Sequence, residues 1–204
     1  MPRDSSDLFQ NIRRRSLTGI LTVLWIIVPY GLLQHIAIRE ILWVKPSAFD
    51  LAIPVNFHSL WFYLTFYGLL GWIGLVIDDR SFKRYIRSIW WTALISHIVF
   101  FLVPNGVTRE AIQADSAPLV YQWLVAADQP RNAFPSLHAS LSVLAGLAAN
   151  ASSSLHPTLK IAAWIWIVGI LWSTIALRQH YAVDLISGSI LATITWWLVS
   201  RKQG

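Results

Sequence analysis

Residues 159–177 read LKIAAWIWIVGILWSTIAL, an apolar run whose one charged side chain, Lys160, lies next to its start. A helix needs about 20 predominantly apolar residues to cross the hydrocarbon core of a bilayer. The run lacks the strict alternation of apolar and polar residues that marks a transmembrane β-strand. It therefore predicts a membrane-spanning helix, which satisfies its own backbone hydrogen bonds in lipid.

Five further apolar blocks share this character. They lie at residues 16–36, 58–77, 88–103, 137–151 and 181–199. The third and fourth of these are shorter than a usual span, so we expect them to extend into flanking residues. The chain of 204 residues is 55% hydrophobic and only 13% charged, which excludes an ordinary soluble domain. The sequence predicts an all-α, polytopic membrane protein, a six-transmembrane-helix bundle that forms one domain over residues 1–204.

The distribution of Lys and Arg predicts the orientation of this bundle. With the N-terminus inside, the inner segments hold eleven of the 16 basic residues. The outer segments hold the rest: Arg39, Lys45, Arg109, Arg131 and Arg178. This asymmetry predicts a multi-pass protein of the cytoplasmic (inner) membrane with both termini in the cytoplasm. The net charge of +6 then reflects topology and attraction to anionic membrane lipids, and we expect no nucleic-acid partner.

Two other features bear on packing. Gly68, Gly71 and Gly74 recur at three-residue spacing, which favours close packing against a neighbouring helix. Residues 117–127 form an apolar stretch in an outer connection, where we expect a short helix along the membrane interface. The chain has no cysteine, so a disulfide framework or a thiolate nucleophile is excluded.

The first motif that carries chemistry is NAFPSLH at residues 132–138. Pro135 suits the first turn of a helix, so we expect the fourth helix to begin there. A helix start offers free N–H groups and the positive end of the dipole to a phosphate. Ser136 and His138 would both lie beside that anion.

The second motif is RQHYAVD at residues 178–184, where the fifth predicted helix ends and the sixth begins. His180 and Asp184 are four residues apart, which places them on one face of a helix. Asp184 can then accept a hydrogen bond from His180 Nδ1 and leave Nε2 basic, so the imidazole is available as a nucleophile. A structural ion pair is the alternative for these two residues. Zinc bound by the two histidines and the aspartate is another alternative, which a chelator would test.

Together, Pro135-Ser136-Leu137-His138, Ser173-Thr174 and His180-Tyr181-Ala182-Val183-Asp184 resemble the type 2 phosphatidic acid phosphatase superfamily over roughly residues 50–188. The NAFPSLH run and the His-Tyr-x-x-Asp run resemble most the branch that contains inositol phosphorylceramide synthases. Residues 49–54, with Tyr63 and Tyr67 after them, are similar to a stretch of the same branch. We interpret them as a wall of the lipid cleft.

This resemblance implies a two-step phosphotransfer without metal or cofactor. His180 would attack phosphorus to form a phosphohistidine, and Asp184 would orient it and stabilise its charge. His138 would protonate the leaving alkoxide. Water or an alcohol acceptor would then take the phosphoryl group.

The chain departs from the superfamily where phosphate is held. Thr174 stands in place of an arginine, and Leu102 in place of a lysine. The phosphate-binding candidates are therefore Arg109, Arg131 and Arg178, chosen by charge and outer location, together with Ser136. Each of the three arginines has an alternative role as an anchor at the interface.

Three functional hypotheses follow. The first is a lipid phosphatase that acts on a phosphate ester at the outer face of the membrane. The second is a transferase that moves a phosphoryl head group to an alcohol. The third is a transporter or scaffold without catalysis, against which the lack of an inverted repeat counts. The sequence leaves the lipid phosphate and the oligomeric state open.

Overall fold

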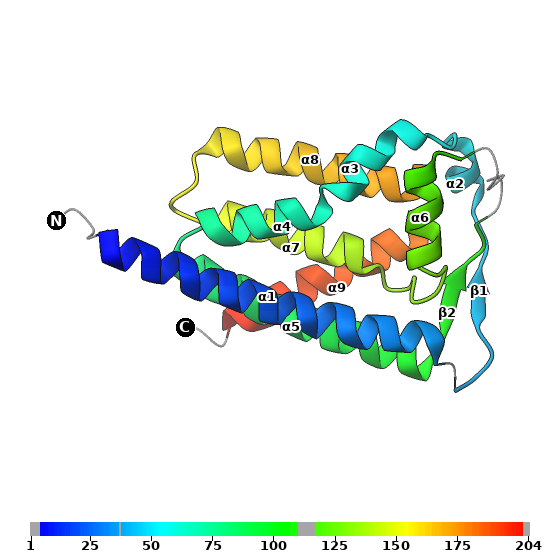
Figure 1. The fold of residues 1–204 in the computed structure, drawn as a ribbon, viewed down its shortest axis with the longest axis horizontal. Helices are drawn as coiled ribbons and strands as arrows, with labels where there is room; N and C mark the ends of the chain where they lie inside the picture. The colour runs from blue at the N-terminus through cyan, green and yellow to red at the C-terminus, as the bar shows by residue number, and fades with distance from the viewer. Residues whose placement is uncertain (1–4, 37, 110–116, 202–204) are drawn as a thin grey trace.

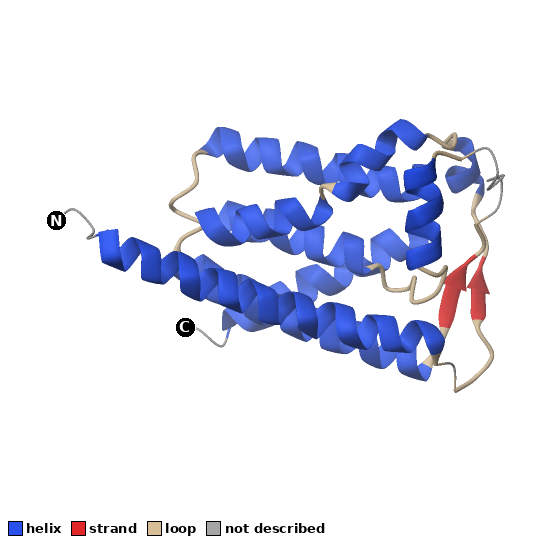
Figure 2. Cartoon of the chain, in the orientation of Figure 1, coloured by secondary structure: helices blue, strands red, loops and turns tan. Residues whose placement is uncertain are grey.

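The computed structural model describes residues 5–36, 38–109 and 117–201. The chain forms a bundle of roughly parallel and antiparallel helices with one small sheet at one end (Figures 1 and 2). The long helices are α1 (Ser5–His35), α4 (Phe66–Val76), α5 (Asp79–Leu102), α7 (Leu137–Ala151), α8 (Pro157–Ala176) and α9 (Ala182–Arg201). The shorter elements are α2 (Ala48–Ala52), the 3-10 turn η1 (Phe57–Ser59), α3 (Leu60–Leu64) and α6 (Leu119–Ala127).

The predicted all-α membrane fold is confirmed. Within the described residues, five helical segments are long and apolar enough to cross a membrane. They are Gln10–His35, Phe57–Val76, Asp79–Leu102, Pro157–Ala176 and Ala182–Arg201. The third predicted block extends as expected, since α5 begins at Asp79. The fourth does not extend: α7 covers the predicted residues 137–151 and stops.

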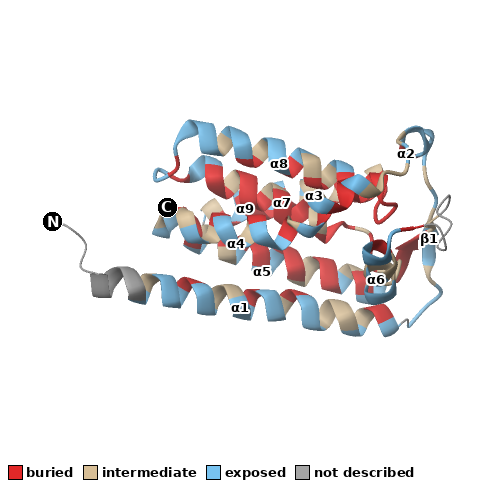
Figure 3. Ribbon diagram, turned by 45° about the horizontal axis from the view of Figure 1, so that its top comes forward, coloured by how far each residue is buried: buried red, intermediate tan, exposed pale blue. Residues whose placement is uncertain are grey.

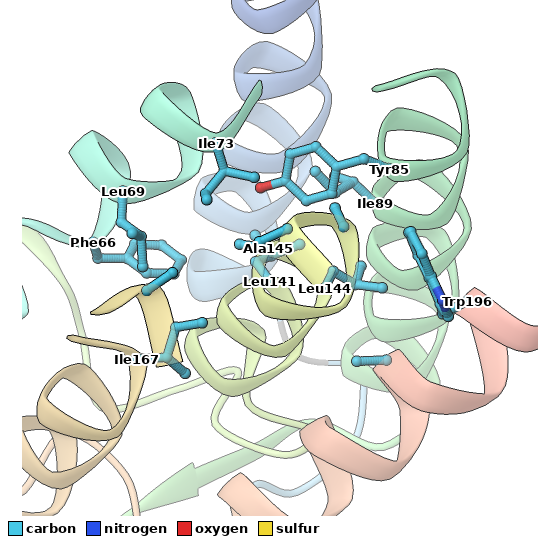
Figure 4. Close-up of a cluster of buried hydrophobic side chains, with 14 of the residues drawn as sticks. Phe66, Leu69, Ile73, Tyr85, Ile89, Leu141, Leu144, Ala145, Ile167 and Trp196 are labelled. Atoms are coloured by element: carbon cyan, nitrogen blue, oxygen red, sulfur yellow. The ribbon is translucent and has the colours of Figure 1, made fainter. Parts of the chain in front are cut away.

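The short α7 lies at the centre of the bundle, in contact with α4, α5, α8 and α9. Its side chains are largely buried (Figure 3). Leu141, Leu144 and Ala145 form the middle of the main apolar core (Figure 4). A helix that is surrounded by protein does not have to match the thickness of the bilayer, which accounts for its length.

Small residues let two helices approach α7 closely. A Cβ added at Gly188 of α9 would lie 2.4 Å from the carbonyl oxygen of Ser136, and one added at Gly146 would lie 2.6 Å from the ring of Trp164 in α8. The glycines in α4 behave differently. A Cβ at Gly68 or Gly71 would meet nothing within 4 Å, so the predicted close packing at these two positions is wrong. Spacing alone does not distinguish a glycine in contact from a glycine that lines open space.

A two-stranded parallel sheet, absent from the sequence prediction, joins the connection after α1 to the connection after α5. Strand β1 (Leu42–Val44) pairs with β2 (Asn105–Val107), Leu42 opposite Asn105. The side chain of Asn105 then holds the first motif: its Nδ2 donates to the carbonyl of Phe134 at 2.9 Å, and its Oδ1 accepts from Phe134 N at 2.7 Å. The sheet thus fixes the segment that leads into α7.

Candidate active site

The two motif histidines meet at the end of the bundle that carries the sheet. His138 lies in the first turn of α7, and His180 lies in the turn between α8 and α9. His138 Nδ1 is 3.2 Å from His180 Nε2, a hydrogen bond in which either ring supplies the proton. The His138 ring packs on Tyr63 and Phe66, with centroids 4.8 and 4.7 Å away. The predicted pair is therefore in contact and held by aromatic neighbours.

Asp184 stands behind His180, and its geometry differs from the predicted one. Because α9 begins only at Ala182, His180 precedes the helix, and Asp184 Oδ2 accepts a hydrogen bond from Tyr181 N at 2.9 Å. His180 Nδ1 lies 3.7 Å from the same oxygen, close enough for an ion pair and too far for a hydrogen bond. Among the described residues neither His180 Nδ1 nor Asp184 Oδ1 has a hydrogen-bond partner, although both are buried. A small rotation of the imidazole would complete the predicted contact, as catalytic hydrogen bonds often tighten when substrate binds.

Ser136 connects the two motifs. It caps α7, because its Oγ accepts from Ala139 N at 3.2 Å, and its own N–H donates to the carbonyl of Asp184 at 3.1 Å. The helix thus begins at Leu137, two residues after the predicted start at Pro135. Ser136 is completely buried. These bonds give it a positioning role, and its contact with phosphate stays a prediction.

The three predicted arginines surround the site and bind backbone. Arg178 donates to the carbonyls of Asp50 at 2.8 Å and Ile53 at 2.9 Å. Arg131 donates to the carbonyl of Gln34 at 2.8 Å. Among the described residues that line the pocket holding both histidines, there is no arginine. Phosphate binding by these side chains stays a prediction, and it needs them to turn.

Arg109 also braces the turn that carries His180. It donates to the carbonyl of Asp128 and to Gln179 Oε1, both at 2.7 Å. Tyr121 of α6 supports the same turn by donating to the carbonyl of Leu177 at 2.9 Å. Burial raises the pKa of the Tyr121 hydroxyl, so this donor keeps its proton at neutral pH. The predicted short helix therefore exists as α6 and helps to position His180, and its place at the membrane interface stays a prediction.

Asp50 positions the start of α9, whereas the sequence predicted for it only a place in the wall of the cleft. Its side chain is buried, and its Oδ1 accepts a hydrogen bond from Ala182 N at 2.7 Å, at the start of α9. Its Oδ2 accepts from Ser47 N at 2.8 Å, which completes a capping box on α2. Asp50 and Arg178 thus tie the first long connection to the turn that carries His180.

The histidines face a pocket of about 260 Å³ between α1, α3, α4, α6 and α7. Tyr63 and Tyr67 line it, as the cleft-wall interpretation expected. Asp128 was not predicted: it lines the pocket and its Oδ1 accepts from the Tyr30 hydroxyl at 3.0 Å and from Gln34 Nε2 at 2.5 Å. Gln34, a polar residue near the end of an apolar block, is a signal in the sequence that could have pointed here.

The site has the composition expected for histidine chemistry. Among residues 5–36, 38–109 and 117–201, no group of three His, Cys, Asp or Glu side chains is arranged to bind one metal ion. Two histidines in contact, with a buried carboxylate behind one of them, are groups that can serve as a nucleophile and an adjacent proton donor.

The fold and this site together define a helical membrane protein with a histidine-based candidate active site. A family model described as the PAP2 superfamily matches residues 32–198, and the chain belongs to this superfamily. The predicted superfamily is therefore confirmed. No curated protein and no solved structure matches the chain.

Proposed function

We propose that the protein is an integral membrane lipid phosphatase that acts through a phosphohistidine on His180. The observation that carries the proposal is the 3.2 Å contact between His138 Nδ1 and His180 Nε2 at the mouth of an apolar pocket. Membership of a superfamily of phosphatases and phosphotransferases supports it. The pocket is lined by aliphatic and aromatic side chains together with a few polar ones, a composition that suits a lipid with a polar head group.

The proposed chemistry starts with His180 Nε2 unprotonated and His138 protonated, and the contact between the two rings opens so that Nε2 can reach phosphorus. His180 Nε2 attacks phosphorus while the bond from phosphorus to the lipid oxygen breaks, and His138 donates its proton to that oxygen. His138 then takes a proton from water as the water oxygen attacks the phosphohistidine, which releases inorganic phosphate and restores both rings. Asp184 stabilises the positive charge that develops on His180. We expect the Nε groups of Arg109 and Arg178, which have no hydrogen-bond partner among the described residues, to donate to the non-bridging oxygens after these side chains turn towards the pocket.

We place the site at the outer face of the cytoplasmic membrane, with α7 as a sixth crossing. The start of α1 and the end of α9 lie at the same end of the bundle, opposite the sheet and the histidines (Figure 1). An even number of crossings accounts for this arrangement. The excess of Lys and Arg in the segments at the terminal end supports a cytoplasmic position for both termini.

The test is phosphate release by the purified protein from a panel of lipid phosphates in detergent or liposomes, with and without excess chelator. We expect turnover of at least one lipid phosphate, and an unchanged rate with chelator because the proposed steps use no metal. Loss of activity in chelator would replace this mechanism with a metal-dependent one. No turnover across the panel would favour the transporter or scaffold hypothesis.

A second candidate function, transfer of the phosphoryl head group to an alcohol, is favoured by Asp128. A carboxylate repels a phosphate but accepts hydrogen bonds from hydroxyl groups, and Asp128 shares the pocket with both histidines. An alcohol held by Asp128 would replace water in the second step. The resemblance to the branch of inositol phosphorylceramide synthases supports the same function.

Replacement of Asp128 by Asn distinguishes the transferase function from the phosphatase function. If an alcohol binds there, Asp128→Asn lowers the ratio of transfer to hydrolysis by about tenfold, the worth of one charged hydrogen bond. The measurement is the ratio of phosphorylated polyol to free phosphate at a fixed polyol concentration. An unchanged ratio, or hydrolysis alone in the wild type, would leave the phosphatase as the function.

A further inference from the structure

A second cavity of about 420 Å³ lies between α1, α4 and α5, next to the pocket of the histidines. The two cavities share three wall residues, Ile26, Ile27 and Tyr67. We name the second cavity the α1–α4 groove. Its position makes it an extension of the candidate active site into the membrane-embedded part of the bundle.

We propose that the α1–α4 groove binds the hydrocarbon chain of the lipid whose phosphate lies at His138 and His180. The proposal rests on the phosphatase or phosphotransferase function given above. It adds the place and the direction of the lipid chain.

The walls of the groove have the character of a chain-binding site. They are formed mainly by aliphatic and aromatic side chains, with Gly19 from α1 and Gly71 and Gly74 from α4. A Cβ at Gly19 or Gly71 would meet nothing within 4 Å, so these glycines leave room in the groove that a larger side chain would fill. Space for a ligand would account for glycine at positions 19 and 71.

The two ends of the cavity differ in their capacity to bind phosphate. Arg15 closes the inner end, but its guanidinium donates to the carbonyls of Gly74 at 3.2 Å and Ile77 at 2.6 Å and pairs with Asp79. Tyr85, which Figure 4 shows pointing towards Ile73, brings an uncharged hydroxyl to this groove. The proposed nucleophile and proton donor, His180 and His138, are at the other end. The head group therefore lies there and the chain runs towards Arg15.

The length of the groove indicates how long a hydrocarbon chain it can hold. From Ile26 to Arg15 the wall of α1 extends about 16 Å at 1.5 Å per residue. One leaflet contributes about 15 Å of the hydrocarbon core. A hydrocarbon chain that fills the groove reaches past the midplane of the bilayer. We therefore expect the rate of phosphate release to rise with the length of the hydrocarbon chain until the groove is full.

Filling the groove tests the proposal, and α4 offers a matched control. Gly68 is one turn from Gly71 and equally uncrowded, but it lines a separate shallow cavity against α8. We expect Gly71→Leu and Gly19→Leu to lower the ratio of kcat/KM for a long-chain to a short-chain alkyl phosphate by about tenfold or more. Gly68→Leu should leave this ratio unchanged. Equal effects of Gly68→Leu and Gly71→Leu, or no effect of either, would overturn the proposal.

A binding measurement separates this proposal from the catalytic one. A long-chain alkyl phosphate with a photoreactive diazirine at mid-chain should label α1 and α4 in the wild type and in Gly68→Leu, and much less in Gly71→Leu. Labelling with this pattern but without turnover would retain the groove and reject the phosphatase. Turnover without labelling of α1 or α4 would retain the phosphatase and reject the groove.

Discussion

Replacing His180 by Ala should abolish phosphate release from the lipid phosphate that the wild type turns over best. The side chain supplies the attacking atom, and loss of a covalent nucleophile removes a factor of about 10⁴ or more from kcat. Binding of the lipid chain should change little, because most of the residues that line the pocket come from α1, α3, α4, α6 and α7. The direct measurement is trapping of a radiolabelled phosphoenzyme, which should survive alkali and decay in acid.

The matched control is His58→Ala. His58 is an exposed histidine that precedes α3, outside the pocket of the histidine pair. This variant should retain wild-type activity and the trapped phosphoenzyme. If His180→Ala kept more than a few per cent of the activity, or if the label remained on the protein, another residue would be the nucleophile and the proposed mechanism would be wrong.

Much of the fold can be predicted from the sequence because lipid imposes a simple condition on each helix. Long apolar runs mark α5, α8 and α9, and the block at 137–151 matches α7 to the residue. The ends of helices are harder to predict, because the capping residue decides them. Ser136 caps α7, which begins at Leu137 and not at the predicted Pro135. The sheet was missed because strands of three residues are too short to show a period.

The candidate site could be predicted in part, because some of its residues lie in short local motifs. His138, His180 and Asp184 lie in two short motifs at helix ends, so local pattern and resemblance were sufficient to select them. Asp128 and Asp50 belong to the site only because distant segments pack together: Asp50 reaches Ala182, and Asp128 reaches α1. Such contacts depend on tertiary packing, which a single sequence does not display.

For the three arginines, the sequence predicted a location near the site but could not predict their hydrogen-bond partners. All three lie near the site, and their outer position stays a prediction. Their hydrogen bonds to backbone carbonyls follow from loops that only the folded chain defines. Positive charge near a motif therefore identified residues that hold the backbone around the site. The contact of each arginine with phosphate stays a prediction.

The second large effect concerns His138, whose proposed role is to carry protons in both steps. Replacing His138 by Ala should lower kcat for an alkyl phosphate by about 10²–10⁴, the usual worth of general acid–base catalysis. Replacing it by Phe should have the same effect, while the new ring keeps the packing against Tyr63 and Phe66. If His138→Phe were active and only His138→Ala were impaired, the residue would have a packing role alone.

An activated substrate separates the two proton transfers. An aryl phosphate with a weakly basic leaving group needs no proton on departure, so the first step should be nearly as fast in His138→Phe as in the wild type. The second step still needs a base to take a proton from water, so the phosphohistidine should accumulate. Rapid mixing should therefore show a burst of the phenol equal to the enzyme concentration, followed by slow turnover. A uniform slowing without a burst would mean that His138 acts only before the phosphoenzyme forms, and that another group activates the water.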